Sequence, residues 1–346
     1  MDIVLTHQTA LAFWRSPHAS AAVRLRRAGT SPLIPQTMTR FDVGAVHRLV
    51  SSSDPVHVLV SDRGGRHRRA GVTAHLCGCR LSASALFSID IPSLGEIGVV
   101  SPEVCIGQMA RRLSFEEALM LAFELCGTYR RSAVQAGQHG GGPGFVTDYA
   151  SFPVTSAARL RRASKELPAS VFARRAQSIL PYVLDGSRSP VESMLAALLT
   201  LPTARGGYAL PAPELNPRIE RKGNPGIELE GSPWRGFEGA DAAHPRRGGY
   251  FCDLCWLDRK VAVEYDSNQE HTGPNRITRD AIRYNDLRAL GFQVLVATWG
   301  QLRSIDECDR LAGSIARALG VRVRIRMGDY RCRQLALRRS LGLPAD

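Results

Sequence analysis

Residues 250–266, YFCDLCWLDRKVAVEYD, constrain the fold more than any other part of the chain, because two strand-forming runs flank a polar turn. The runs cover residues 250–256 and 261–266, and the turn between them is LDRK. A β-hairpin centred on this turn places Asp253 directly opposite Glu264. The sequence therefore predicts two antiparallel strands that bring a pair of acids face to face.

The three acids of this hairpin are predicted to share one face of the sheet. Side chains alternate along a strand, so Asp253 lies on the same side as Glu264 and Asp266. Like charges directly opposite each other destabilise a sheet, which indicates a cation between the carboxylates or a raised pKa on one of them. Mg²⁺ or Mn²⁺ is the simplest such cation. The opposite face is apolar and predicts the core: Leu254, Trp256, Val261, Val263 and Tyr265.

Length and composition predict a soluble, cytoplasmic protein of two domains. The chain has 346 residues, of which 44% are hydrophobic, so it can bury sizeable cores. Its 45 Lys and Arg outnumber its 32 Asp and Glu and give a net charge of +13, mostly from Arg, which favours nucleic-acid phosphates as partners. An Arg-rich proteome is the alternative explanation. No apolar stretch is long enough to span a bilayer, so no membrane partner is expected.

The cysteines indicate a reducing compartment, because they form no dense framework of the secreted type. Two pairs, C-x-C at 77 and 79 and C-x-x-C at 252 and 255, raise the alternative of a structural zinc site. The second pair lies within one predicted strand, where positions i and i+3 face opposite ways, so zinc is disfavoured. The eight cysteines are Cys77, Cys79, Cys105, Cys126, Cys252, Cys255, Cys308 and Cys332.

Residues 1–180 are predicted to form a mixed helical and β region. Residues 1–30 suggest two helices, the second of them basic. Further along, Ser114 and Glu117 form a capping box at the start of an apolar helix. This region ends at a domain boundary near Gly186. Its other predicted elements are strands at 56–61, 70–75, 86–90 and 97–100 and basic helices at 157–167 and 169–180.

Residues 187–320 are predicted to form a second, α/β domain, followed by a basic extension over 321–346. Gly291 lies where a helix C-terminus belongs. Apolar residues alternate with Arg over 321–327 (VRVRIRM), which predicts a half-exposed strand. The other predicted elements of this domain are a helix from Pro190 to about 199, the acidic hairpin, a helix at 277–290, a strand at 293–297 and a helix at 305–319.

The order helix, strand, strand, helix, strand, with acids at Glu192, Asp253 and Glu264, resembles the PD-(D/E)xK nuclease superfamily. Within it, the sequence is most similar to the very-short-patch-repair-related (Vsr-like) endonuclease domains. The resemblance covers residues 187–305 and implies a restriction-endonuclease-like αβββαβ core. The segments that carry it are SPVES around Glu192, FCDLCW around Asp253, VAVEYDSNQEH at 261–271, RITRDAIRYNDLRALGFQVL at 276–295 and TWGQL from Thr298.

The resemblance also implies the chemistry of such a site. Asp253 and Glu264 would hold Mg²⁺ or Mn²⁺, which polarises the scissile phosphate and lowers the pKa of the attacking water. Glu192 would orient metal-bound water, and His271 would act as a base. The superfamily pattern has Lys two residues after the second acid, where this chain has Asp266. Vsr-like relatives often carry Asp there too, so the cation is expected from elsewhere: Lys260, Arg247 or Arg279.

Several of these residues have a purely structural explanation as well. Ser189 and Glu192 form a capping box with Pro190 at the first helical position, which explains Glu192 without catalysis. A histidine in an exposed loop, as His271 would be, is often inert. The two hairpin acids would alternatively lie on a solvated sheet face and pair with arginines.

Four basic residues are predicted to contact the nucleic-acid backbone. Arg279 and Arg283 fall on one side of the helix at 277–290, together with Asp286. The alternative is a solvated face with salt bridges. Arg247 and Lys260, which are also candidates for the missing cation, are the other two.

The first half of the chain resembles the AbiEi-type antitoxins of abortive-infection systems. The segments concerned are VHVLVSDRGGRHRRAGVTAH, at 56–75, and VVSPEVCIGQMARRLSFEEALMLAFELCG, at 99–127. That family pairs a small DNA-binding helical unit with a mixed α/β domain. The resemblance therefore implies DNA-binding helices within residues 1–50.

The sequence thus predicts a two-domain α/β protein that cleaves DNA phosphodiester bonds with Mg²⁺ or Mn²⁺, in a defence or toxin–antitoxin context. RNA stays open as a substrate, because phosphate chemistry is common to both polymers. A homodimer and a toxin or defence-system partner are compatible with this prediction. The alternative is a non-catalytic, DNA-binding transcriptional regulator of antitoxin type that keeps the nuclease fold as a scaffold.

Overall fold

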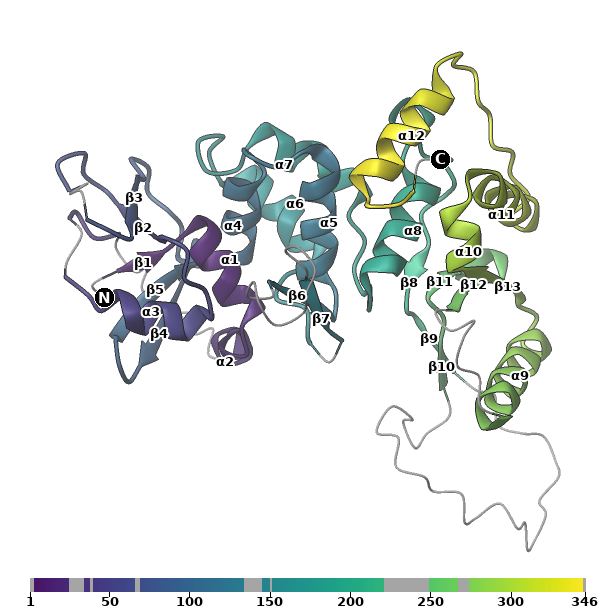
Figure 1. The fold of residues 1–346 in the computed structure, drawn as a ribbon, viewed down its shortest axis with the longest axis horizontal. Helices are drawn as coiled ribbons and strands as arrows, with labels where there is room; N and C mark the ends of the chain where they lie inside the picture. Colours follow the sequence, from purple (N-terminus) through teal and green to yellow (C-terminus); the bar gives the residue numbers. More distant parts are fainter. Residues whose placement is uncertain are drawn as a thin grey trace, which may run out of the picture. The chain divides into compact units, whose positions relative to one another are not determined.

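The computed structural model is a mixed α/β protein whose chain divides into two compact units, residues 1–194 and 195–346 (Figure 1). The residues that the structure describes are 3–24, 34–37, 40–65, 69–133, 145–149, 151–220, 249–266 and 274–344.

The first unit is built on a five-stranded mixed sheet with the order β3-β2-β1-β5-β4. The short strand β1 (Val4–Leu5) lies at its centre, antiparallel to β2 (Val56–Val60) and parallel to β5 (Gly95–Val100). The outer strands are β3 (Val72–Leu76), parallel to β2, and β4 (Leu86–Ile91), antiparallel to β5. Four of these strands confirm the strand signals that the sequence gives between residues 56 and 100.

Helix α1 (His7–Arg15) follows the central strand and is a core helix. Its Phe13 and Trp14 are fully buried, and the Trp14 Nε1–H group donates to the Val100 carbonyl at 2.9 Å. The other elements of this unit are α2 (His18–Arg24), α3 (Val43–Val50), η1 (Ala83–Ala85), α4 (Pro102–Met109), α5 (Phe115–Cys126), β6 (Arg130–Ala133), β7 (Phe145–Asp148), α6 (Ala157–Glu166), α7 (Arg174–Ile179) and η2 (Leu180–Tyr182).

The start of α5 shows how local sequence sets a helix boundary here. The Ser114 hydroxyl accepts the Glu117 N–H at 3.1 Å, and the Ser114 N–H donates to the Glu117 carboxylate at 2.7 Å. This is the predicted capping box, which satisfies two N–H groups that the first turn leaves without partners. The apolar residues that follow recur with the period of a helix, and nine residues of α5 are buried.

A stack of three histidines lies on the sheet of the first unit; we call His7, His57 and His75 the histidine stack. The His7 and His75 rings are stacked with centroids 3.8 Å apart, and the His57 and His75 rings stack at 5.0 Å. The His57 Nδ1 and His75 Nε2 atoms share a hydrogen bond at 2.8 Å. Burial, followed by the neighbouring imidazoles, lowers the pKa of His7 to about 3 and that of His75 to about 4.

Helix α8 (Pro190–Thr200) crosses the boundary between the two units in the sequence. The second unit contains a four-stranded sheet with the order β13-β12-β11-β8. Strand β11 is antiparallel to both of its neighbours, β8 and β12, whereas β12 and β13 are parallel and are connected by a helix, α9. The elements are η3 (Thr203–Arg205), β8 (Glu214–Leu215), β9 (Arg218–Glu220), β10 (Gly249–Phe251), β11 (Leu254–Trp256), η5 (Leu257–Arg259), β12 (Val261–Asp266), α9 (Pro274–Ala289) and β13 (Gln293–Thr298).

The C-terminal part adds three helices, α10 (Trp299–Arg303), α11 (Ile305–Ala318) and α12 (Tyr330–Ser340). Gly291 takes a φ of +85° after α9, as the predicted helix end requires. The predicted strand at residues 321–327 is wrong: that segment is irregular, and within the described chain it pairs with no strand. An alternating pattern forms a strand only where another strand supplies hydrogen-bond partners.

Candidate metal centre

The register of the acidic hairpin is the one that the sequence predicts. Leu254 pairs with Val263 and Cys255 pairs with Ala262. The ladder ends at Leu254, but its register, continued by one residue, brings Asp253 opposite Glu264, and the charge of Asp253 acts on the Glu264 carboxylate. Alternation along the strands and the length of the turn were sufficient to fix this register, because a slip of one residue would turn every side chain to the other face. We call Asp253 and Glu264 the carboxylate pair.

The first strand of the hairpin is not continuous, which corrects the prediction of one strand over residues 250–256. It breaks at Cys252 and Asp253: β10 pairs with β9, whereas β11 pairs with β12 and β8. The Asp253 carboxylate accepts the Tyr265 N–H at 2.7 Å through its Oδ2 atom, in place of a main-chain acceptor. Its carbonyl accepts the Asn216 N–H at 3.1 Å. The break therefore holds Asp253 rigidly at the edge of β12.

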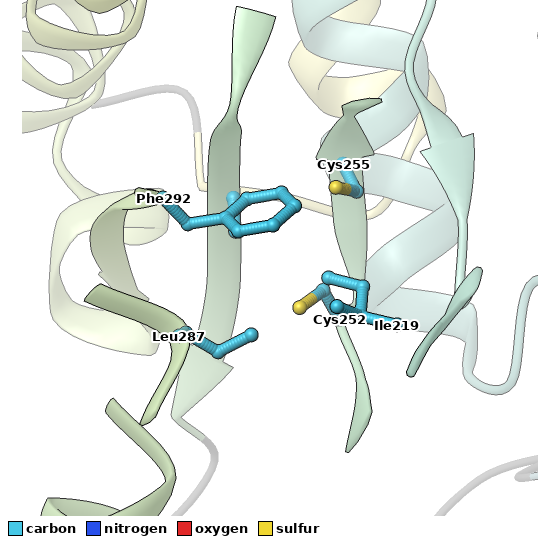
Figure 2. Packing of buried hydrophobic residues seen from close by; sticks show 6 residues of the cluster. Ile219, Cys252, Cys255, Leu287 and Phe292 are labelled. Carbon is cyan, nitrogen blue, oxygen red and sulfur yellow. The ribbon is translucent and has the colours of Figure 1, made fainter. Parts of the chain in front are cut away.

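The face that carries the acids is buried as well, so the expectation of a single core face is wrong. Cys255 and Ala262 on that face are fully buried, together with Cys252 in the break. Figure 2 shows Leu287 of α9 and Phe292 pointing toward Cys252 and Cys255. The reason is the crossover: a helix that connects two parallel strands covers one face of their sheet.

Glu264 is the most constrained of the predicted site residues, because the residue is only 4% exposed. Its Oε2 atom accepts a hydrogen bond from Nη2 of Arg283, within an ion pair. Its Oε1 atom is buried and has no hydrogen-bond partner among the residues that the structure describes. The thiol of Cys252, a weak donor, also interacts with this carboxylate and favours its ionised form. Burial, and then the negative charge of Asp253, raise the pKa of Glu264 to about 7, against the opposing effect of Arg283.

Arg283 connects the helix α9 to both strands of the site. Its Nη2 group also donates to the Phe251 carbonyl at 3.2 Å, at the end of β10. The Nε–H group of Arg283 is buried and finds no partner within the described chain. One turn further, the Asp286 carboxylate accepts a hydrogen bond from the Tyr250 hydroxyl. The polar side of α9 is therefore turned toward β10 and β12, and its Arg283 is part of the acidic site.

Two further predicted residues lie on β12 and at its start. Asp266 is half-buried at the end of β12, on the same side as Glu264, and its register partner on β13 is Thr298. Lys260 is exposed and adopts a positive φ of 53°. Its Nζ atom lies 4.6 Å from the centroid of the Phe292 ring, a distance typical of a cation–π contact.

Glu192 belongs to the first unit, and its carboxylate is used locally. It accepts the Arg188 N–H at 2.8 Å and the Ser189 hydroxyl at 3.0 Å. The Glu192 N–H in turn donates to the Ser189 hydroxyl at 3.2 Å. These bonds fit the capping explanation, which the sequence already offers beside the catalytic one.

The remaining candidates lie outside what the structure describes. His271 and Arg247 are not among the described residues, and of Arg279 only the helical backbone in α9 is described. Sequence reasoning missed the contact between Arg283 and Glu264. A signal was available: Arg283 lies one helical turn before Leu287, so an apolar anchor at 287 turns Arg283 toward the sheet as well.

The carboxylate pair fits a hard divalent cation that takes few protein ligands. Within the described ranges, no group of three or more His, Cys, Asp or Glu side chains is arranged to hold a metal ion. Mg²⁺ and Mn²⁺ do not need such a group, because Mg²⁺ is commonly held by one or two carboxylates and completes its shell with water and phosphate oxygens. The unpartnered Oε1 of Glu264, next to Asp253, is the kind of oxygen that such an ion binds.

Comparison with known proteins gives relatives but no function. No protein-family model and no solved structure matches this chain. The chain is 28% identical over 144 residues to the uncharacterized proteins MT2308 and Rv2248 of Mycobacterium tuberculosis, strains CDC 1551 / Oshkosh and ATCC 25618 / H37Rv. The match covers 42% of this chain and 42% of each relative. Among the described residues, no helix is long and apolar enough to cross a membrane.

Proposed function

We propose that the second unit is a metal-dependent nuclease that hydrolyses phosphodiester bonds of DNA, with the αβββαβ core of Vsr-like endonucleases. The observation that carries this proposal is the buried Oε1 of Glu264, which has no hydrogen-bond partner in the described chain and lies beside a second carboxylate, Asp253. A buried carboxylate oxygen without a partner is costly, so its retention needs a reason. Binding a cation supplies that reason.

Each residue of the site then has a definable task. Asp253 and Glu264 would hold Mg²⁺ or Mn²⁺, which supplies Lewis-acid polarisation of the phosphate and a more acidic water. Arg283 pairs with Oε2 of Glu264 and leaves Oε1 free to bind, so it positions that carboxylate and favours its ionised form against the effects of burial and Asp253. The Tyr265 N–H fixes Asp253 in the same way from the backbone. Asp266, on the same side of β12, extends the acidic surface toward the end of the strand.

The charge of the chain supports nucleic acid as the substrate. The net charge of +13 favours polyanions, and Arg suits phosphates because it donates two hydrogen bonds at once. In the second unit, Arg322, Arg324 and Arg326 are exposed along the irregular segment that precedes α12. These arginines are available to the backbone of a nucleic acid, and the first unit would select the target or the partner.

A cleavage assay on the full chain tests the proposal. Purified protein is incubated with supercoiled plasmid, single-stranded DNA or RNA in the presence of Mg²⁺, Mn²⁺ or a chelator. The assay includes Asp253→Asn and Glu264→Gln, with Asp258→Asn as the matched control, because Asp258 is an exposed acid in the turn of the same hairpin. Metal-dependent cutting that disappears in the first two variants and persists in the control supports the nuclease. Cutting of RNA alone would change the substrate class.

A second function, DNA binding without catalysis, has one observation in its favour. The ion pair with Arg283 already compensates part of the charge of Glu264, as a structural scaffold would require. A regulator of antitoxin type should bind DNA equally well with a chelator, and equally well after Asp253→Asn or Glu264→Gln. Absence of cutting under every condition, together with such binding, would favour the regulator.

A further inference from the structure

A pair of thiols lies in the first unit, apart from the carboxylate pair of the second. Cys77, Gly78 and Cys79 follow directly after β3. The Sγ atoms of the two cysteines are 3.6 Å apart, and both are free thiols. The Cys77 thiol is also 3.6 Å from the carbonyl oxygen of Cys79. Their C-x-C spacing raises only the alternative of a zinc site, and nothing in the proposed nuclease uses these two cysteines.

The two thiols differ in access and in anchoring. Cys77 is 9% exposed, and its N–H donates to the Val60 carbonyl at 2.9 Å, which continues the pairing of β2 with β3 by one residue. Burial raises the pKa of the Cys77 thiol to about 11. Cys79 is half-exposed and lies beyond the sheet. A reagent from solvent therefore reaches Cys79 first, and the Cys77 sulfur is close enough to react with Cys79 in a second step.

Gly78, the single residue between the two cysteines, has open space on its side-chain side. An added Cβ atom at Gly78 would meet nothing within 4 Å, so no neighbouring group crowds this residue on that side. The two sulfur atoms must approach from 3.6 Å to about 2 Å to form a bond, and the open space at Gly78 permits this. A disulfide across so short a link closes a small, strained ring, and strained or exposed disulfides are easily reduced again.

We infer that Cys77 and Cys79 form a reversible thiol–disulfide site that reacts with low-molecular-weight disulfides. The Cys79 thiol gives its proton to water, and its sulfur attacks one sulfur of the small disulfide. A mixed disulfide forms at Cys79, and the first small thiol leaves. The Cys77 sulfur, after losing its proton, then attacks Sγ of Cys79 and expels the second small thiol. Two protein thiols are oxidised, and one small disulfide is reduced to two thiols.

The other cysteines of the chain do not combine these features. Cys105, Cys126, Cys252, Cys255 and Cys308 are buried, so a reagent has no direct access to them. Cys332 on α12 is exposed. Within the part of the chain that the structure describes, no hydrogen bond joins Cys332 to a second thiol, so it should stop at the mixed disulfide and serves as an internal comparison for the pair.

The test uses the full-length protein and glutathione disulfide as the probe, followed by blocking of free thiols, tryptic digestion and mass spectrometry. The peptide of residues 70–80, AGVTAHLCGCR, contains both cysteines and no other. In the wild-type protein it should be recovered lighter by two hydrogens and without glutathione. Cys77→Ser should leave one glutathione on Cys79, whereas Cys79→Ser should react at Cys77 at least about 10-fold more slowly, because Cys77 is buried.

Three results would overturn the inference. The peptide could keep two free thiols in excess glutathione disulfide, or carry glutathione on both cysteines, or react equally fast in the two single variants. A circular dichroism spectrum of each variant checks that it is folded, and Cys332→Ser supplies a substitution that should leave the chemistry of the 70–80 peptide unchanged. Reduction of the oxidised protein by dithiothreitol should restore both thiols; a modification that resists it would contradict a reversible site.

Discussion

The histidine stack of the first unit and the carboxylate pair of the second are both clusters of titratable side chains in a partly buried setting. The imidazoles lose their charge at neutral pH, stack on one another and share a hydrogen bond between His57 and His75. In the carboxylate pair, Glu264 instead forms an ion pair with Arg283 of α9, and its Oε1 atom has no hydrogen-bond partner in the part of the chain that the structure describes. A cluster whose polar groups hydrogen-bond to one another is explained by folding alone. A cluster that contains a buried oxygen without a hydrogen-bond partner indicates that the site binds a ligand.

The largest expected effect is on the carboxylate pair. Glu264→Gln removes the charge and keeps the shape, so binding of Mn²⁺ and metal-dependent cleavage should each fall by more than about 100-fold, beyond the loss typical of a residue that only supports a ligand. Folding should be preserved, because a neutral amide costs less to bury than a charged carboxylate. A calorimetric titration with Mn²⁺ measures metal binding separately from cleavage activity. Unchanged Mn²⁺ affinity in this variant would rule out Glu264 as a ligand.

Arg283 should have the next largest effect, and on two quantities at once. Arg283→Met leaves the Glu264 carboxylate buried and unpaired, which should lower the free energy of unfolding by about 3 kcal/mol. It should also weaken Mn²⁺ binding by about 10-fold, because the carboxylate loses the contact that orients it. Urea unfolding and calorimetry give the two values. Arg288→Met is the matched control, since Arg288 is an exposed arginine on the same helix.

The double variant Arg283→Met with Glu264→Gln sharpens this prediction. If the two side chains interact as the structure has it, the double variant should be more stable than Arg283→Met alone, because no unpaired charge is left buried. Strictly additive losses of stability would instead mean that Arg283 acts on stability through its contact with the Phe251 carbonyl.

The hairpin shows how far the sequence determines such a site. Alternation and turn length fix the register, so the meeting of Asp253 with Glu264 could be predicted. The partner of Glu264 is harder to predict: the Leu287 anchor indicates only that Arg283 faces the sheet, and which group Arg283 meets there depends on how α9 packs. The strand break at Cys252 has the same origin, since it depends on β9, a strand more than thirty residues away in the sequence. Residues 321–327 are the opposite case: their sequence alternates as a strand does, but in the described chain no other strand pairs with them.

The histidine stack predicts a dependence of stability on pH. In the unfolded chain a histidine takes up a proton near pH 6.5, whereas the folded chain resists protonation of His7 until about pH 3 and of His75 until about pH 4. Between these limits the unfolded state binds more protons, so the stability of the first unit should fall as pH drops from about 6.5 toward 4. Urea unfolding at several pH values measures the slope. His75→Phe, which cannot be protonated, should reduce it, and an unchanged slope would contradict this origin.

The smallest effect is expected for substitution of Lys260. This substitution distinguishes a contact of Lys260 within the protein from a contact with DNA. Its ammonium group lies over the Phe292 ring at the start of β12, and an exposed cation–π contact contributes about 0.5–1 kcal/mol. Lys260→Met should therefore lower the free energy of unfolding by no more than this. If Lys260 contacts only Phe292, the affinity for DNA and its dependence on salt concentration should not change. A shallower salt dependence would place Lys260 among the phosphate contacts, because each phosphate neutralised by the protein releases counterions. Arg259→Met is the matched control, since Arg259 is the neighbouring exposed cation and pairs with Asp258.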